Sequence, residues 1–214
     1  EGAAKVSNKY SIPRDTRDWK LDNAVADIQT AEANHALVIA SYLYRPYDHR
    51  RILYTGKTGG IAAWPRFRLL GTLLSRKNYA LCVVRQVDSS STFQHCFVAH
   101  TLIDIHLLAA CTSAFSLYRL PAGWNYTPAE LAAGKTLAGE PIPLELNMRP
   151  EVLAKISEAV GESVAGEEVF DYVYGVLHDP EYRVKYFEFL KIDYPRIPYP
   201  KDLAEYRLFA TRGA

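Results

Sequence analysis

The chain has 214 residues, 49% of them hydrophobic and 23% charged, with a formal net charge of +1, which is typical of a globular protein with one or two domains. No apolar run approaches the ~20 residues that a membrane-spanning helix needs, and the first residues lack the apolar core of a signal peptide. The three cysteines form no CxxC pair and read as reduced thiols, so nothing in the composition suggests a membrane-embedded or secreted protein, and we expect a cytoplasmic one.

The first 125 residues predict a β-rich part that follows a short lead-in. Residues 1–15 read as a flexible lead-in, and Leu21, Val25 and Ile28 form one helical stripe that predicts a helix over 16–32. A short helix is expected after Pro65. Apolar and β-branched runs predict strands at 36–44, 51–54, 79–87, 96–99, 103–108 and 115–120. The run at 79–87 is apolar on nearly both faces, so we expect it near the middle of a sheet.

The C-terminal part is predicted to be helical. We interpret residues 126–148, which are rich in proline, glycine and alanine, as a linker with one helical turn. Apolar stripes predict helices at 150–160, at 167–177, after Asp179-Pro180 and at 203–209. The expected fold class is therefore α+β: a mixed, largely antiparallel β-sheet with flanking helices over residues 16–125, followed by an all-helical part over 149–214.

Charge is distributed very unevenly along the chain. Residues 1–125 hold 15 Lys and Arg and 9 Asp and Glu, a net charge of +6, whereas residues 126–214 hold 10 and 15, a net charge of −5. Between residues 45 and 85 nine basic residues accompany a single acid, Asp48. A basic part joined to an acidic part indicates that one face meets a polyanion, and nucleic acid is the first candidate.

No catalytic, metal or cofactor site can be assigned from the sequence. The string Gly56-Lys57-Thr58 lacks the upstream glycine of a phosphate-binding loop, which leaves a turn as the better interpretation. The His and Cys residues between 95 and 106 fit no common zinc spacing. The serines at 89–91 lack the G-x-S-x-G pattern of a nucleophile elbow, and no glycine-rich cofactor loop follows a strand.

The basic segment supplies the candidate nucleic-acid contacts. Arginine and glutamine suit the edges of guanine and adenine, while lysine and serine suit phosphates. A single arginine is about as often paired with an acid, but one acid within the segment cannot neutralise nine bases. The candidate contacts are Arg45, Arg50, Arg51, Lys57, Arg66, Arg68, Arg85, Gln86, Ser90, Ser91 and His95.

The stretch EEVFDYVYGVLHDPEYRVKYFEFLKIDYPRIPYP, residues 167–200, resembles the closing segment of Type ISP and related single-chain adenine-specific DNA methyltransferases of bacterial restriction–modification systems. Four further motifs occur in the order of that family: YRPYDHRRILYTG at 44–56, WPR at 64–66, NYALCVVRQVDSSSTFQHCFVAHTLIDIHLL at 78–108 and SLYRLP at 116–121. Together these motifs span nearly the whole chain.

This resemblance implies a C-terminal target-recognition (specificity) domain that reads double-stranded DNA and has no catalytic activity in isolation. Its partners would be duplex DNA and the methyltransferase domain of the parent polypeptide, which would bind S-adenosylmethionine and methylate a flipped adenine at N6. This chain would hold no cofactor. The motif residues carried over to DNA contact are Arg45, Arg50, Arg66, Arg85, Gln86 and His95. The YGVLHDPEYR motif resembles a packing element, in which Tyr174, Leu177, Tyr182 and Phe187 would form a helix–helix core.

Two other functions stay open at this point. In the first, the acidic helical part, residues 149–214, is a docking module that packs against the methyltransferase core. In the second, the chain is a nuclease with an unrecognised metal site, which predicts plasmid cleavage with magnesium. Neither the recognised DNA sequence nor cleavage by the parent enzyme can be deduced from these residues.

Overall fold

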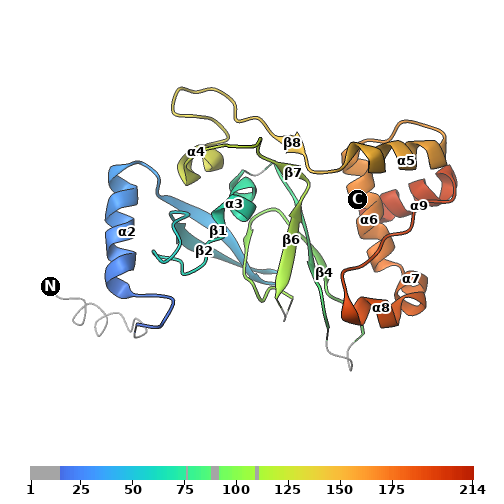
Figure 1. The fold of residues 1–214 in the computed structure, drawn as a ribbon, viewed down its shortest axis with the longest axis horizontal. Helices are drawn as coiled ribbons and strands as arrows, with labels where there is room; N and C mark the ends of the chain where they lie inside the picture. Colours follow the sequence, from blue (N-terminus) through green and yellow to red (C-terminus); the bar gives the residue numbers. More distant parts are fainter. Residues whose placement is uncertain (1–14, 76, 88–91, 109–110) are drawn as a thin grey trace.

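The computed structural model describes residues 15–75, 77–87, 92–108 and 111–214 (Figure 1). The fold is α+β, as predicted, with a β-rich part followed by a helical part. Figure 1 shows α2 (Leu21–Ala33) at one end of the molecule and the C-terminal helices at the other, with the strands between them. No helix in the described ranges is long and apolar enough to cross a lipid bilayer.

The first sheet is a hairpin with one short added strand. Strands β1 (Val38–Arg45) and β2 (Asp48–Tyr54) pair antiparallel, and β5 (Leu102–Ile103) pairs parallel to β1 on its other side. Pro46 and Tyr47 form the hairpin turn, in which Tyr47 adopts a left-handed φ of 67°. The register shifts between Leu43 and Arg45, so the hairpin is irregular where it reaches its turn.

The second sheet is antiparallel, and the strand predicted to be central lies in its middle. Strand β3 (Ala80–Val84) pairs with β4 (Cys96–Ala99) on one side and with β6 (Thr112–Ser116) on the other. Val83 packs in the same apolar cluster as Tyr172 of the helical part, whereas Cys82 and Val84 pack with Leu43 of the first sheet. Alternating residues of β3 thus join the helical part to the first sheet.

The segment that we expected to be a linker contains regular structure. Helix α4 (Pro128–Ala133) begins with a capping box, in which Thr127 and Glu130 each accept a hydrogen bond from the other residue's backbone N–H. Strand β8 (Glu145–Leu146) pairs with β7 (Tyr118–Arg119). Leu131 is buried in a cluster with Tyr54, beneath α3 (Phe67–Leu70) and the 3-10 helix η1 (Gly71–Leu74). Residues 126–148 therefore belong to the packed β-rich part over much of their length.

The helical part is formed by α5 (Pro150–Val160), α6 (Gly166–His178), α7 (Pro180–Lys185), α8 (Phe187–Ile192) and α9 (Leu203–Gly213). Asp179 caps α7 by accepting a hydrogen bond from the Tyr182 N–H at 2.8 Å. Leu177 and Tyr182 are buried in the core and Tyr174 packs against it, in agreement with the predicted packing motif. Phe187 lies outside this core, because the chain changes direction at Tyr186, between α7 and α8.

Two strand predictions were wrong in extent. The strand expected over 103–108 ends at Ile103, because the Asp104 carboxylate accepts the His106 N–H at 2.8 Å and closes a turn. The strand expected over 115–120 is divided, because β6 ends at Ser116 and β7 belongs to a different sheet.

Candidate nucleic-acid interface

The β1–β2 hairpin brings two of the candidate arginines together on one tyrosine ring. Arg45 lies at the end of β1, and Arg50 lies on β2 opposite Tyr42. The guanidinium carbon of Arg50 is 3.8 Å from the centre of the Tyr44 ring, and that of Arg45 is 4.0 Å from the same point. Cation–π contacts at these distances hold both guanidinium groups beside the ring.

Arg50 also forms a two-pronged pair with Asp48. Its Nε donates to Oδ1 at 3.1 Å and Oδ2 at 3.2 Å, and its Nη2 donates to Oδ2 at 2.7 Å. The hydrogen bond from Arg50 holds the pKa of the Asp48 carboxyl below its usual value, so this pair is charged at neutral pH. The Arg50 side chain is 54% exposed, and it therefore combines a fixed position with access to a ligand.

Arg45 is more enclosed than Arg50. Its Nη1 donates to Asp104 Oδ1 at 2.9 Å and to the Tyr44 carbonyl oxygen at 2.6 Å, while the Tyr42 hydroxyl donates to Asp104 Oδ2. Burial alone would raise the pKa of Asp104, but the hydrogen bonds from Tyr42, His106 and Arg45 lower it overall. Arg45 thus joins the hairpin to the segment after β5.

The loops after β2 carry three further candidates, Lys57, Arg66 and Arg68. Lys57 is exposed and forms no ion pair with any described residue. Arg66 has a left-handed φ of 50° before α3, and its guanidinium carbon lies 5.5 Å from the ring centre of the exposed Trp64. Arg68 donates to the Trp124 carbonyl oxygen at 2.5 Å and stacks on its ring, so it links α3 to the segment before α4.

Arg51 faces away from this network along β2. It pairs with Ser41 in the register of the hairpin, is exposed, and has no ion-pair partner in the described part of the chain. A free guanidinium on a strand surface suits a phosphate contact.

The candidates that follow β3 lie where the two parts of the molecule meet. Arg85 Nε donates to Asp193 Oδ1 at 3.2 Å, and the Val87 N–H donates to the Lys191 carbonyl oxygen at 3.2 Å. Gln86 is exposed. His95 Nδ1 is buried and has no hydrogen-bond partner in the described structure, and burial lowers the pKa of this imidazole. Ser90 and Ser91 lie outside the described residues.

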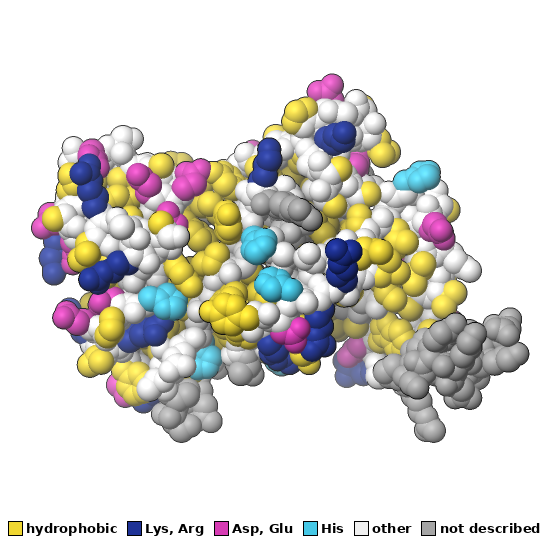
Figure 2. Space-filling model, turned by 180° about the vertical axis from the view of Figure 1, so that it is seen from behind, with side chains coloured by type: hydrophobic (Ala, Val, Ile, Leu, Met, Phe, Trp, Pro, Cys, Tyr) yellow, Lys and Arg dark blue, Asp and Glu magenta, His cyan; other side chains and the backbone are white. Residues whose placement is uncertain are grey.

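The basic segment is less unpaired than its single acid suggested. Acids from outside the segment reach it in the fold, because Asp104 pairs with Arg45 and Asp193 pairs with Arg85, while Asp48 pairs with Arg50. On the face shown in Figure 2, Lys and Arg side chains stand in separate groups with acidic and apolar side chains between them. The structure therefore brings together Arg45 and Arg50 but joins neither of them to Arg85.

Residues 2–214 match the family described as the Type ISP C-terminal specificity domain. The chain belongs to this family. Among solved structures, a chain in the cryo-EM structure of a DrdV–DNA complex has a similar fold, with a TM-score of 0.60 and 24% sequence identity. The similarity covers 82% of the present chain and 15% of that chain, so the specificity domain corresponds to a small share of its relative's length. None of the curated proteins matches the chain.

Sequence reasoning missed the residues of the specificity domain that support its arginines. Tyr44 contacts both Arg45 and Arg50, and Asp104 accepts a hydrogen bond from Arg45. Tyr47 extends from the hairpin turn with 85% of its surface exposed. Tyr44 and Tyr47 both stand in the YRPYDHR string, where aromatic residues alternate with basic ones, and that alternation was the available signal. Asp104 is 59 residues from Arg45 in the chain, and no local pattern connects them.

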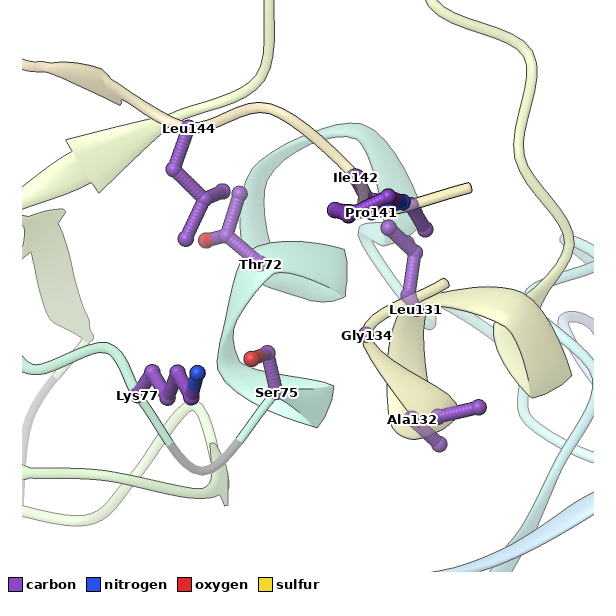
Figure 3. A pocket seen from close by; sticks show the side chains of 10 residues that line it. Thr72, Ser75, Lys77, Leu131, Ala132, Gly134, Pro141, Ile142 and Leu144 are labelled. Carbon is purple, nitrogen blue, oxygen red and sulfur yellow. The ribbon is translucent and has the colours of Figure 1, made fainter. Parts of the chain in front are cut away.

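The specificity domain also has an open pocket of about 310 Å³ between η1 and α4 (Figure 3). Its lining is mostly apolar, with Thr72, Ser75 and Lys77 as the polar members and no carboxylate. No group of three metal-ligating side chains is found among the described residues. The pocket therefore lacks the acid–base pair or ligand set that hydrolytic chemistry requires.

Proposed function

We propose that this chain is the module of a Type ISP restriction–modification protein that recognises a specific sequence in double-stranded DNA. The observation that carries the proposal is the family match over residues 2–214, since the family is described as a specificity domain. The structural relative was solved with DNA, which supports the same role. The exposed Lys and Arg side chains on the hairpin and the following loops supply the positive charge that binds a phosphate backbone.

The contacts divide into two kinds in this proposal. Arg51, Lys57 and Arg66 are exposed and form no ion pair with a described residue, so they suit phosphates and would position the duplex without reading it. Gln86, Arg50 and Arg85 suit base edges in this proposal; the two arginines are held by Asp48 and Asp193, and a held donor can discriminate between bases. Arg68 has a structural role, because both its hydrogen bond and its ring contact are made with Trp124.

The chemistry of modification belongs to another part of the parent protein in this proposal. An N6-adenine methyltransferase domain would bind S-adenosylmethionine and receive the flipped adenine, while the specificity domain holds the surrounding duplex. The pocket between η1 and α4 does not fit this cofactor, because no lining residue offers a carboxylate for the ribose hydroxyls. Incubation of the chain with plasmid and magnesium should accordingly produce no cleavage.

Salt dependence of duplex binding tests the proposed function. With four to six phosphate contacts in total, three of them from Arg51, Lys57 and Arg66, log K should fall against log salt concentration with a slope of roughly −4 to −5. Fluorescence anisotropy of a labelled duplex, measured across a salt series, gives this slope. A flat dependence would contradict the proposal, because phosphate contact releases counterions whatever sequence is bound.

A second candidate function is docking to the methyltransferase core through the helical part. The observation in its favour is a set of large apolar side chains exposed on α7 and α8, namely Val184, Phe189 and Ile192. The two functions are compatible, since the hairpin arginines and these helices lie in different parts of the molecule (Figure 1).

A further inference from the structure

The hydrogen bonds of Arg50 leave one end of its guanidinium available. A guanidinium has a side edge, formed by Nε and one terminal nitrogen, and an end formed by both terminal nitrogens. Asp48 occupies the side edge through Nε and Nη2. Nη1 donates to no acceptor within the described ranges, so the Nη1–Nη2 end remains available for a ligand.

The plane of the Arg50 guanidinium is fixed by the residues beneath it. Its central carbon lies 3.8 Å from the Tyr44 ring centre, and the Tyr44 carbonyl oxygen accepts a hydrogen bond from Arg45. Arg45 is in turn held by Asp104, whose side chain is only 18% exposed and also accepts from Tyr42. The free end of Arg50 is therefore presented by a side chain that rests on a partly buried network.

We propose that Arg50 reads a guanine in the major groove through its Nη1–Nη2 end, with Asp48 and Tyr44 as positioning residues. This inference rests on the proposed function. Guanine presents two adjacent acceptors, O6 and N7, which match the two donors of that end. Asp48 favours a base over a phosphate as the ligand, because its ionised carboxylate lies 2.7 Å from Nη2 and would repel a phosphate group.

The adjacent candidate Arg45 has a different role in this proposal. Its Nη1 already donates to both Asp104 and the Tyr44 carbonyl oxygen, and its side chain is less exposed than that of Arg50, 38% against 54%. Arg45 supports the ring on which Arg50 stacks. The two arginines of one motif thus separate into a reading residue and a structural one.

Selection from a pool of duplexes with randomised positions tests this assignment on the full 214-residue chain. The wild-type protein should enrich a motif that contains a guanine which Arg50→Lys no longer prefers, while the other positions of the motif persist. Lysine keeps the charge but lacks the paired donors. Tyr44→Phe keeps the ring and should keep the guanine preference, whereas Tyr44→Leu should weaken it at that position alone.

Substitution of that guanine by 7-deazaguanine supplies a second measurement. It removes the N7 acceptor, so wild-type affinity should fall about ten-fold, within the range expected for part of a bidentate contact. Arg50→Lys should bind the two duplexes equally. Circular dichroism melts of each variant confirm that the fold is retained.

The outcomes separate this inference from the proposed function. If the wild-type protein enriches no motif, the proposed function fails and the inference fails with it. If a motif is enriched but Arg50→Lys leaves every position unchanged, the recognition role stands and the assignment of Arg50 is overturned. Equal loss of affinity for all sequences would make Arg50 a phosphate contact, which also overturns the assignment, as would wild-type binding that is insensitive to 7-deazaguanine.

Discussion

Single residues of the basic segment differ in what the fold lets them do. Arg45, Arg68 and Arg85 each donate to a group elsewhere in the chain, whereas Lys57 has no ion-pair partner in the described ranges. The sequence identified these residues as candidates, because their charge and clustering are visible in it. It could not separate them, because their partners Asp104, Trp124 and Asp193 lie 59, 56 and 108 residues away.

Arg85 and Lys57 are expected to respond differently to substitution by alanine. Arg85→Ala should relax preference at one base position by about 1–3 kcal/mol, while Lys57→Ala should weaken binding to all sequences and reduce the salt slope by about 1. The reason is that Arg85 is oriented by Asp193, whereas Lys57 is a loop cation that no described acid pairs with. Competition binding with cognate and random duplexes measures both effects.

Asp193→Asn provides the matched control for Arg85. It removes the carboxylate that orients Arg85 but keeps the Arg85 side chain itself. The free energy of unfolding should change little, because exposed ion pairs of this kind contribute about 0–1 kcal/mol. Equal losses for Arg85→Ala and Lys57→Ala on both duplexes would show that Arg85 does not read a base.

Helices and strands were predicted well where the residues that determine them lie within the same segment of the chain. Helices α5 and α6 were predicted nearly to their ends, because their apolar stripes and the proline at position 150 lie within each segment. The strand expected over 103–108 was too long. The Asp104 carboxylate accepts hydrogen bonds from the His106 N–H, which closes a turn, and from the side chains of Tyr42 and Arg45. Apolar periodicity carries no information about such contacts.

The contact between α6 and α9 depends on glycine in a way that a substitution can test. A Cβ added at Gly175 would overlap the Phe209 carbonyl oxygen, and one at Gly213 would overlap that of Asp171. Gly175→Ala should therefore force the helices apart and cost about 2 kcal/mol, more than the ~1 kcal/mol that alanine gains in helix propensity. The net loss of about 1 kcal/mol should lower the Tm measured by thermal unfolding by about 2–4 °C.

Gly166→Ala is the control for this prediction within the same helix. Its added Cβ would meet only the side chain of Leu146, which can rotate away, whereas a backbone carbonyl cannot move without its helix. The loss in Tm should be less than half of that for Gly175→Ala. If the two variants unfold at the same temperature, close backbone approach does not limit the α6–α9 contact.

In the whole molecule, the β-rich part and the helical part share a core to which the second sheet contributes. Val83 and Cys96 of the second sheet pack with Tyr172 and Val176 of α6, and the Arg85–Asp193 pair adds a contact at the surface. The charge difference between residues 1–125, at +6, and residues 126–214, at −5, therefore lies within one packed unit. A duplex attracted to the basic part leaves the acidic helices facing solvent or another protein.

In the proposed docking function, the exposed side chains on α7 and α8 are the candidate contacts for such a protein. Val184, Phe189 and Ile192 are 80%, 68% and 63% exposed, and large apolar side chains left exposed on two consecutive helices favour an interface. The double variant Val184→Ser/Phe189→Ser should reduce capture of a separately expressed upstream domain of the parent protein at least ten-fold, since it removes two apolar anchors. Duplex binding by the same variant should be unchanged.

Leu137→Ser, at a side chain that is also 80% exposed but lies between α4 and β8, is the control and should retain capture. Loss of capture with Leu137→Ser, or with variants of the hairpin arginines, would place the docking surface on the basic part instead.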